Sequence, residues 1–189
     1  MNKESLEVFA NQPEFVHIFS VEDHDVHKAK LLAQIESMIK DQKIEKNEKG
    51  YWYDYPLTAR RPYEYYFRHV IYPYVIEVGE KYGLRPRRDT GHGRPWFQQY
   101  VQGSDFGWHQ HEGHWAIIYF VELPEPKEAT EFLDYDIKLK EGDLIFFPTF
   151  LVHRSPEIKS NTRKTIISTN MTYQVDRDYI ELHHKKDFI

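Results

Sequence analysis

The sequence contains no cysteine. Disulfide bonds and thiolate metal sites are therefore excluded, and any metal ion must be held by His, Asp or Glu. The chain also lacks an apolar run of membrane-spanning length and an apolar signal core near Met1, so we expect a soluble cytoplasmic protein with no membrane partner. A basic excess is missing as well, because the formal net charge is −5. This balance argues against a nucleic-acid partner.

Apolar and aromatic residues are plentiful by contrast. The chain has 189 residues, of which 40% are hydrophobic and 16% aromatic. This is enough for one domain with a substantial core and too little for two. We therefore expect a single domain over residues 1–189, with a helical support region at 1–95 and a β core at 96–175.

Two helices are predicted in the first half of the chain. Apolar residues recur at helical spacing over 25–42 and again over 62–82. Pro73 lies inside the second segment and should kink it or split it in two. Residues 15–19 are predicted to form an early strand, whereas 51–56 is aromatic and irregular.

From Trp96 onward the apolar pattern changes to that of short strands separated by glycine and proline. Helices followed by such a run are typical of a jelly roll backed by helices. We predict a mainly β, cupin-like double-stranded β-helix, with the N-terminal helices packed on its outer sheet. The predicted strands are 96–101, 106–111, 115–123, 130–139, 143–147 and 164–173.

A histidine pair stands in one of these strands. Side chains two positions apart share a face of a strand, so His109 and His111 should point into the barrel together. His153 follows Pro148 by five residues, at a place where the chain turns sharply. Two neighbouring imidazoles and a distant third suit Fe(II). Glu112 could enter the site only through a bulge.

A cation follows the third histidine. Arg163 opens the last predicted strand, and a guanidinium at that depth is well suited to gripping a carboxylate. Tyr100 or Tyr119 could add a hydroxyl donor. Lys164 is a rival to Arg163, because the strand register decides which of the two side chains points inward.

These motifs carry a family resemblance. The segment from Trp96 to Asn170 resembles the core of the Fe(II)- and 2-oxoglutarate-dependent oxygenases, in particular a small group from bacteria and phages with a His-x-His motif. The matching positions are Trp96, Gly103, His109-x-His111, Gly142-Asp143-Leu144-Ile145-Phe146-Phe147-Pro148, His153, Arg163 and Ser168-Thr169-Asn170.

The resemblance implies a dioxygenase that uses O2, Fe(II) and 2-oxoglutarate. Such an enzyme decarboxylates 2-oxoglutarate to succinate and CO2 and hydroxylates a C–H bond of a second substrate, here an unidentified small molecule or peptide. His109 and His153 carry over as iron ligands, and Arg163 carries over as the partner of the far carboxylate of 2-oxoglutarate.

One position departs from the family. The second ligand is normally Asp or Glu, and this chain has His111 there, which leaves an iron site one charge unit more positive. Two further hypotheses therefore stay open: a cupin-type three-histidine oxygenase that does not use 2-oxoglutarate, and a non-catalytic jelly-roll binding module. The aromatic segment Tyr51 to Tyr55 could line the opening of the site or be purely structural.

Overall fold

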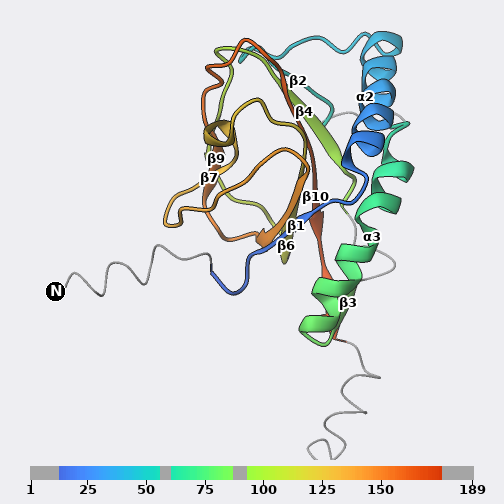
Figure 1. The fold of residues 1–189 in the computed structure, drawn as a ribbon, viewed down its shortest axis with the longest axis vertical. Coiled ribbons are helices and arrows are strands. Elements are labelled where there is room, and N and C mark those ends of the chain that lie inside the picture. The colour runs from blue at the N-terminus through green and yellow to red at the C-terminus, as the bar shows by residue number, and fades with distance from the viewer. Residues whose placement is uncertain (1–12, 56–60, 87–92, 176–189) are drawn as a thin grey trace, which may run out of the picture.

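A computed structural model describes residues 13–55, 61–86 and 93–175. Two helices, α2 (His24–Asp41) and α3 (Glu64–Lys81), lie on the same side of the β-strands in Figure 1. In the described part of the chain, neither helix is both long and apolar enough to cross a bilayer.

The strands form one large sheet and two small ones. The order of the six-stranded sheet is β1-β8-β6-β10-β4-β2, that of the three-stranded sheet is β5-β9-β7, and β11 pairs with β3. All the pairings are antiparallel. The strand bounds are β1 (His17–Ser20), β2 (Trp52–Tyr53), β3 (Leu84–Pro86), β4 (Trp96–Tyr100), β5 (Phe106–His109), β6 (Trp115–Glu122), β7 (Glu131–Phe132), β8 (Asp143–Pro148), β9 (His153–Ser155), β10 (Lys164–Met171) and β11 (Tyr173–Val175), with a short 3-10 helix, η2 (Pro126–Glu128), before β7.

The six-stranded sheet is buried on both faces. Along β6, Ile117 and Tyr119 belong to the core cluster shared with the two helices, whereas Ile118 and Phe120 belong to the cluster shared with β7 and with loop residues near β9. Successive side chains of a strand point to opposite faces, so one strand serves both cores. The architecture is the predicted jelly roll, with helices covering the outer face of the larger sheet.

Both predicted helices are present within two residues of their predicted ends. Pro73 does not split α3, which runs unbroken through it. Apolar residues on both sides of the proline are buried against the sheet, among them Phe67 at 0% and Val75 at 1% exposure. This packing holds the two halves in line despite the lost backbone hydrogen bond.

The N-terminal half contributes strands as well as helices. β1 and β2 form the two edges of the six-stranded sheet, so the aromatic segment expected to be irregular includes a strand. The strand predicted at 130–139 is reduced to β7, and β9 was not predicted. Residues 164–173 divide between β10 and β11, which join different sheets.

Candidate metal centre

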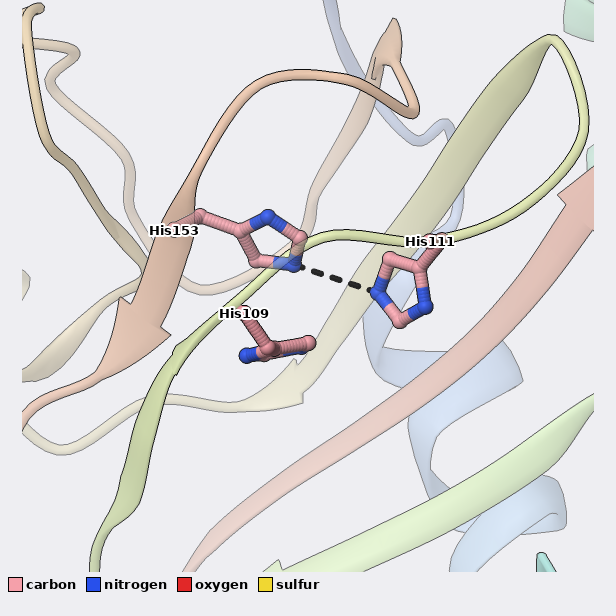
Figure 2. Close-up of side chains that lie close together, drawn as sticks. All are labelled: His109, His111 and His153. Carbon is pink, nitrogen blue, oxygen red and sulfur yellow. Dashed lines mark hydrogen bonds between the residues drawn. The ribbon is translucent and has the colours of Figure 1, made fainter.

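Three histidine side chains converge at one end of the three-stranded sheet (Figure 2). His109 ends β5 and pairs directly with His153, which begins β9. Their ring centroids lie 4.3 Å apart, and the ring of His111 lies 4.9 Å from the first and 5.0 Å from the second. Each ring offers one nitrogen atom to the cluster, and these three atoms all lie within 4.8 Å of one another.

His111 reaches this cluster by a route that differs from the predicted one. β5 ends at His109, so His111 is not on a regular strand. Its backbone N–H donates a hydrogen bond to the carbonyl of Thr149, 3.1 Å away, which brings the chain across toward β8. Gln110 also lines the same cavity as the histidines. Glu112 is exposed and is not part of the cluster found among the described residues.

The outer nitrogens of two of the rings are fixed by the backbone. The Nδ1 atom of His109 lies 2.8 Å from the carbonyl oxygen of Gly107, and that of His153 lies 2.8 Å from the carbonyl oxygen of Leu151. A carbonyl only accepts hydrogen bonds, so each Nδ1 carries a proton and donates it. The Nε2 lone pair of each ring is then directed into the cluster, the arrangement usual for metal-binding histidines.

The three imidazoles are held in the neutral form. Burial lowers the pKa of His111 to about 4 and that of His153 to about 3, and burial also lowers the pKa of His109. A histidine binds metal only when neutral, so these rings are ready ligands at pH 7. Three imidazole nitrogens fit a divalent transition metal such as Fe(II), although they supply no negative charge.

The cluster borders a cavity of about 340 Å³. Aromatic residues from the first half of the chain and from β4 form much of its wall, including the segment Tyr51 to Tyr55 that sequence analysis left undecided. The lining residues are Tyr51, Tyr53, Tyr55, Trp96, Gln98, Tyr100, Phe106, His109, Gln110, His111, Ile118, Thr130, His153, Arg154, Ser155, Ile166 and Ser168. Tyr100 is 1% exposed, and burial raises its pKa well above the ordinary range.

The structure does not bring Arg163 to this cavity, contrary to the prediction. Its Nε and Nη2 atoms donate to the carboxylate of Glu122 over 2.7 and 3.0 Å, and Nη1 donates to Glu36 of α2 over 3.0 Å. Arg163 precedes β10 and shares its side of the sheet with Thr165, which also contacts Glu122. The guanidinium thus ties helix α2 to the outer face of the sheet.

Lys164 points inward instead. It is fully buried, and its Nζ atom donates to the carbonyl of Glu128 over 2.6 Å and to the hydroxyl of Ser155 over 2.8 Å. The same atom lies 5.2 Å from the centre of the Tyr100 ring, its cross-strand neighbour. Burial lowers the pKa of Lys164 to about 7. The register of β10 therefore turns the side chain of Lys164 inward and that of Arg163 outward, because neighbouring side chains of a strand lie on opposite faces.

Tyr119 does not reach the cavity either. It lies on the helix side of β6, where its hydroxyl is 2.7 Å from Nδ1 of His24 in α2. Tyr100 is the one of the two predicted tyrosines that lines the cavity. Trp96 and Gln98 also line the cavity and were not predicted to do so. Their alternation with buried Phe97 along β4 was the available signal.

Comparisons with known proteins identify the fold. No protein-family model matches the chain, and no curated protein sequence matches it. Among solved structures, it is similar to SnoK, a non-heme alpha-ketoglutarate-dependent carbocyclase from nogalamycin biosynthesis, with TM-score 0.63, 9% identity and coverage of 89% of this chain and 83% of SnoK. The chain has the fold of the Fe(II)- and 2-oxoglutarate-dependent oxygenases.

Two further structures support this statement about the fold. A prolyl hydroxylase from Trichoplax adhaerens, solved with a peptide of hypoxia inducible factor, matches with TM-score 0.62, 10% identity and coverage of 95% and 93%. HygX from Streptomyces hygroscopicus, solved with nickel and 2-oxoglutarate, matches with TM-score 0.57, 9% identity and coverage of 91% and 88%. Identities this low speak for the fold and leave the activity to be argued from the site.

Proposed function

We propose that this protein is a non-haem Fe(II)- and 2-oxoglutarate-dependent dioxygenase in which His109, His111 and His153 hold the iron. The observation that carries the proposal is the pairing of two features of one cavity: a cluster of neutral imidazoles on its wall and a buried lysine ammonium behind it. When bound, Fe(II) supplies the redox chemistry that couples O2 and the decarboxylation of 2-oxoglutarate to oxidation of a second substrate.

Lys164 is the proposed partner of the far carboxylate of 2-oxoglutarate. An ammonium group has three N–H donors, and Glu128 and Ser155 accept two of them. The third N–H, together with the phenol of Tyr100 and the hydroxyl of Ser155, would donate hydrogen bonds to a carboxylate. A buried ammonium is costly even when it is hydrogen-bonded, and an incoming carboxylate would compensate its charge. This assignment moves the anchor by one residue, from Arg163 to Lys164.

The proposed outcome is hydroxylation of a C–H bond of a small-molecule or peptide substrate. Carbocyclase, epimerase and hydroxylase are all named among the structures with this fold, so the reaction type is an inference beyond the fold. The chain's own part is to bind both substrates in one cavity and to keep water away from them. Aromatic side chains such as Tyr51 and Phe106 serve that second purpose.

A second candidate function is favoured by the donor set. Three imidazoles without a carboxylate suit an oxygenase of the cupin type that does not use 2-oxoglutarate. Lys164 argues for the first function and His111 for the second. The two differ in whether 2-oxoglutarate is consumed.

The test is succinate formation by the full-length protein with Fe(II), O2 and 2-oxoglutarate, with His153→Ala as the inactive control. We expect slow succinate release even without the second substrate, and none from the control. Iron binding without 2-oxoglutarate binding or succinate release would favour the three-histidine oxygenase. Failure to bind iron at all would leave a jelly-roll binding module.

A further inference from the structure

The three histidines of the metal cluster are not held in the same way. His109 and His153 stand in paired strands, and the Nδ1 atom of each ring donates to a carbonyl two residues earlier in the chain. His111 projects from the coil after β5 (Figure 2), and within the described residues its Nδ1 has no such carbonyl partner. The position of its ring therefore depends on what holds the backbone of that coil.

Thr149 bonds to this coil at three points, which we call the Thr149 clamp. The N–H of His111 donates to the Thr149 carbonyl, and the N–H of Thr149 donates to the carbonyl of His114, each over 3.1 Å. The side-chain Oγ1 of Thr149 donates to the carbonyl of Gly113 over 2.7 Å. Glu112 and Gly113 are exposed, so burial contributes little to holding the coil.

Thr149 also belongs to the turn that leads to the third histidine. It follows Pro148 at the end of β8, and the Leu151 N–H closes the turn by donating to the Pro148 carbonyl over 3.0 Å. The carbonyl of Leu151 then accepts from the ring of His153. Thr149 therefore connects the two segments that bring Nε2 of His111 and Nε2 of His153 to within 3.2 Å of each other.

The clamp includes a glycine in an unusual backbone conformation. Gly113 has a φ of +104°, which residues with a side chain rarely adopt. A Cβ at this position would meet no atom beyond its chain neighbours closer than 3.8 Å. A larger residue would therefore be opposed by the backbone angle and not by a clash.

We propose that Thr149 is a positioning residue for the metal centre, because its clamp fixes the place from which His111 reaches the ion. Thr149 does not line the cavity, so it acts on the ion only through His111. This proposal rests on the metal ligands of the proposed function and not on the use of 2-oxoglutarate.

Substitutions of similar shape test the role of the hydroxyl. Thr149→Val keeps the branched side chain and both backbone bonds but removes the donor, whereas Thr149→Ser keeps the donor. The dissociation constant for Co²⁺ is measured calorimetrically with the full-length protein. We expect Thr149→Val to bind Co²⁺ at least about fivefold more weakly, as the loss of one ordinary hydrogen bond implies, and Thr149→Ser to bind like the parent.

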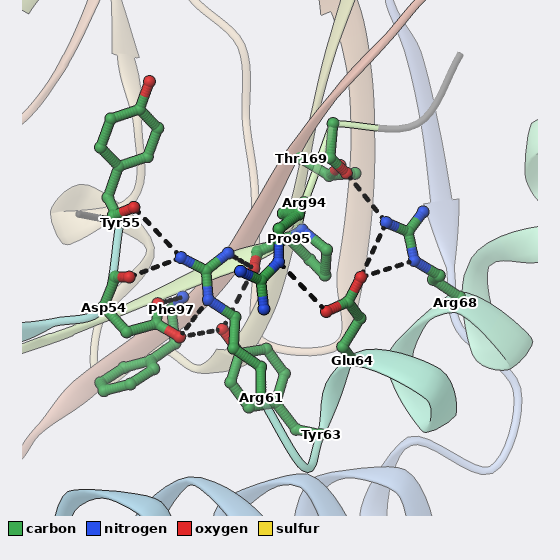
Figure 3. A network of polar contacts seen from close by, with 11 residues as sticks. Asp54, Tyr55, Arg61, Tyr63, Glu64, Arg68, Arg94, Pro95, Phe97 and Thr169 are labelled. Carbon is green, nitrogen blue, oxygen red and sulfur yellow. Dashed lines mark hydrogen bonds and ion pairs between the residues drawn. The ribbon is translucent and has the colours of Figure 1, made fainter. Parts of the chain in front are cut away.

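Thr169→Val is the matched control, and Thr169 is labelled in Figure 3. Thr169 is 2% exposed and Thr149 is 4% exposed, and each donates its Oγ1 to a glycine carbonyl, here that of Gly93 over 2.8 Å. Thr169 pairs with Ile117 on the side of the sheet that faces the helices. The control should lose comparable stability in urea unfolding and keep the parent affinity for Co²⁺.

A double-mutant cycle separates positioning from a general structural role. In the His111→Ala background the clamp has no ligand to position, so adding Thr149→Val should not weaken Co²⁺ binding further. Gly113→Ala should behave like Thr149→Val in both backgrounds. Equal losses of affinity in the parent and in His111→Ala would make the role of Thr149 merely structural and overturn the proposal, as would parent-like binding by Thr149→Val.

Hydrogen exchange of the metal-free protein gives a second measurement. The amide of His111 should exchange at least about fivefold faster in Thr149→Val than in the parent, since one bond of the clamp is lost. Unchanged exchange there would overturn the proposal.

The outcomes also distinguish this proposal from the proposed function. If the parent binds Co²⁺ but releases no succinate, the use of 2-oxoglutarate falls and the role of Thr149 is still decided by the affinities. If the parent binds no Co²⁺, the metal centre and the role of Thr149 are overturned together.

Discussion

The Nε2 atoms of His111 and His153 lie 3.2 Å apart, although the residues are 42 positions apart in the sequence. The contact is possible because both rings are neutral, and a metal ion would take the place of the shared proton. It brings the irregular segment after β5 against the first residue of β9. Both Nε2 atoms are therefore placed close enough together to coordinate one cation.

Replacing either of these histidines should remove the metal. His111→Ala and His153→Ala should each lower Fe(II) affinity by at least about tenfold, the scale on which even outer groups of metal sites act. The measurement is metal content and calorimetric affinity under anaerobic conditions. His114→Ala is the control, because His114 is close in sequence but accepts a hydrogen bond from the Tyr173 N–H outside the cluster. Full iron occupancy in His153→Ala would end the assignment.

His111→Asp should convert the cluster to two imidazoles and one carboxylate. The added negative charge should strengthen Fe(II) binding and make the bound iron easier to oxidise. Affinity and reduction potential report these effects, and succinate release should be retained. If neither quantity changes, His111 is not a ligand. Loss of succinate with iron still bound would support the three-histidine oxygenase.

The register of β10 predicts that Lys164, and not Arg163, binds 2-oxoglutarate. Removing the charged partner of a buried carboxylate costs about 2–5 kcal/mol, so Lys164→Met should raise the dissociation constant at least about tenfold. Arg163→Met should leave it nearly unchanged, because that guanidinium is bound to Glu122 and Glu36. Calorimetric titration with 2-oxoglutarate decides between them. The reverse result would restore Arg163 as the anchor.

Lys164 should also make stability depend on pH. Its folded pKa is about 7, below the ordinary 10.5, so between these values the unfolded chain binds more protons than the folded one. The free energy of unfolding should therefore rise with pH across this window, by at most about 1.4 kcal/mol per pH unit from this group. Below pH 7 the lysine is protonated in both the folded and the unfolded chain, so it adds no further pH dependence to the free energy of unfolding.

Urea unfolding of the protein without ligands at pH 7, 8 and 9 measures this slope. Lys164→Met should lack the contribution, so its stability relative to the parent should decline as the pH rises. Lys159→Met, at a side chain 67% exposed, should follow the parent. Parallel curves for the parent and Lys164→Met would contradict the lowered pKa.

The buried ion pair between Asp54 and Arg61 should matter for stability. Asp54 and Arg61 side chains are 0% and 3% exposed, and removal of one partner leaves the other charged and buried. Asp54→Ala should lower the free energy of unfolding by about 3–5 kcal/mol. Glu64→Ala breaks the partly exposed pair with Arg68 and should cost at most about 1 kcal/mol. Equal small losses in urea unfolding would show that the Asp54 pair is not essential to the fold.

The sequence by itself was enough to predict the fold class, both helices and the clustering of the three histidines. Helical and strand periods are local properties, and a His-x-His pair with a later histidine after a proline is a local signal of a shared site. The absence of cysteine limited the possible metal ligands to His, Asp and Glu. β2 and β9 escaped detection because strands of two or three residues carry too little pattern, and only pairing with β4 and β5 defines them.

Tertiary structure alone decided which side chains face the cavity. The register of β10 turns Lys164 inward and leaves Arg163 to the glutamates of β6 and α2, and β6 likewise turns Tyr119 toward the helices. A shift of one residue reverses every such assignment, and nothing in the local sequence fixes it. The meeting of Tyr55 with Trp96, and of Arg154 with Trp108, depends on contacts between distant segments. The residue types of the site could therefore be identified from the local sequence, whereas the direction of each side chain was set by the packing of the whole barrel.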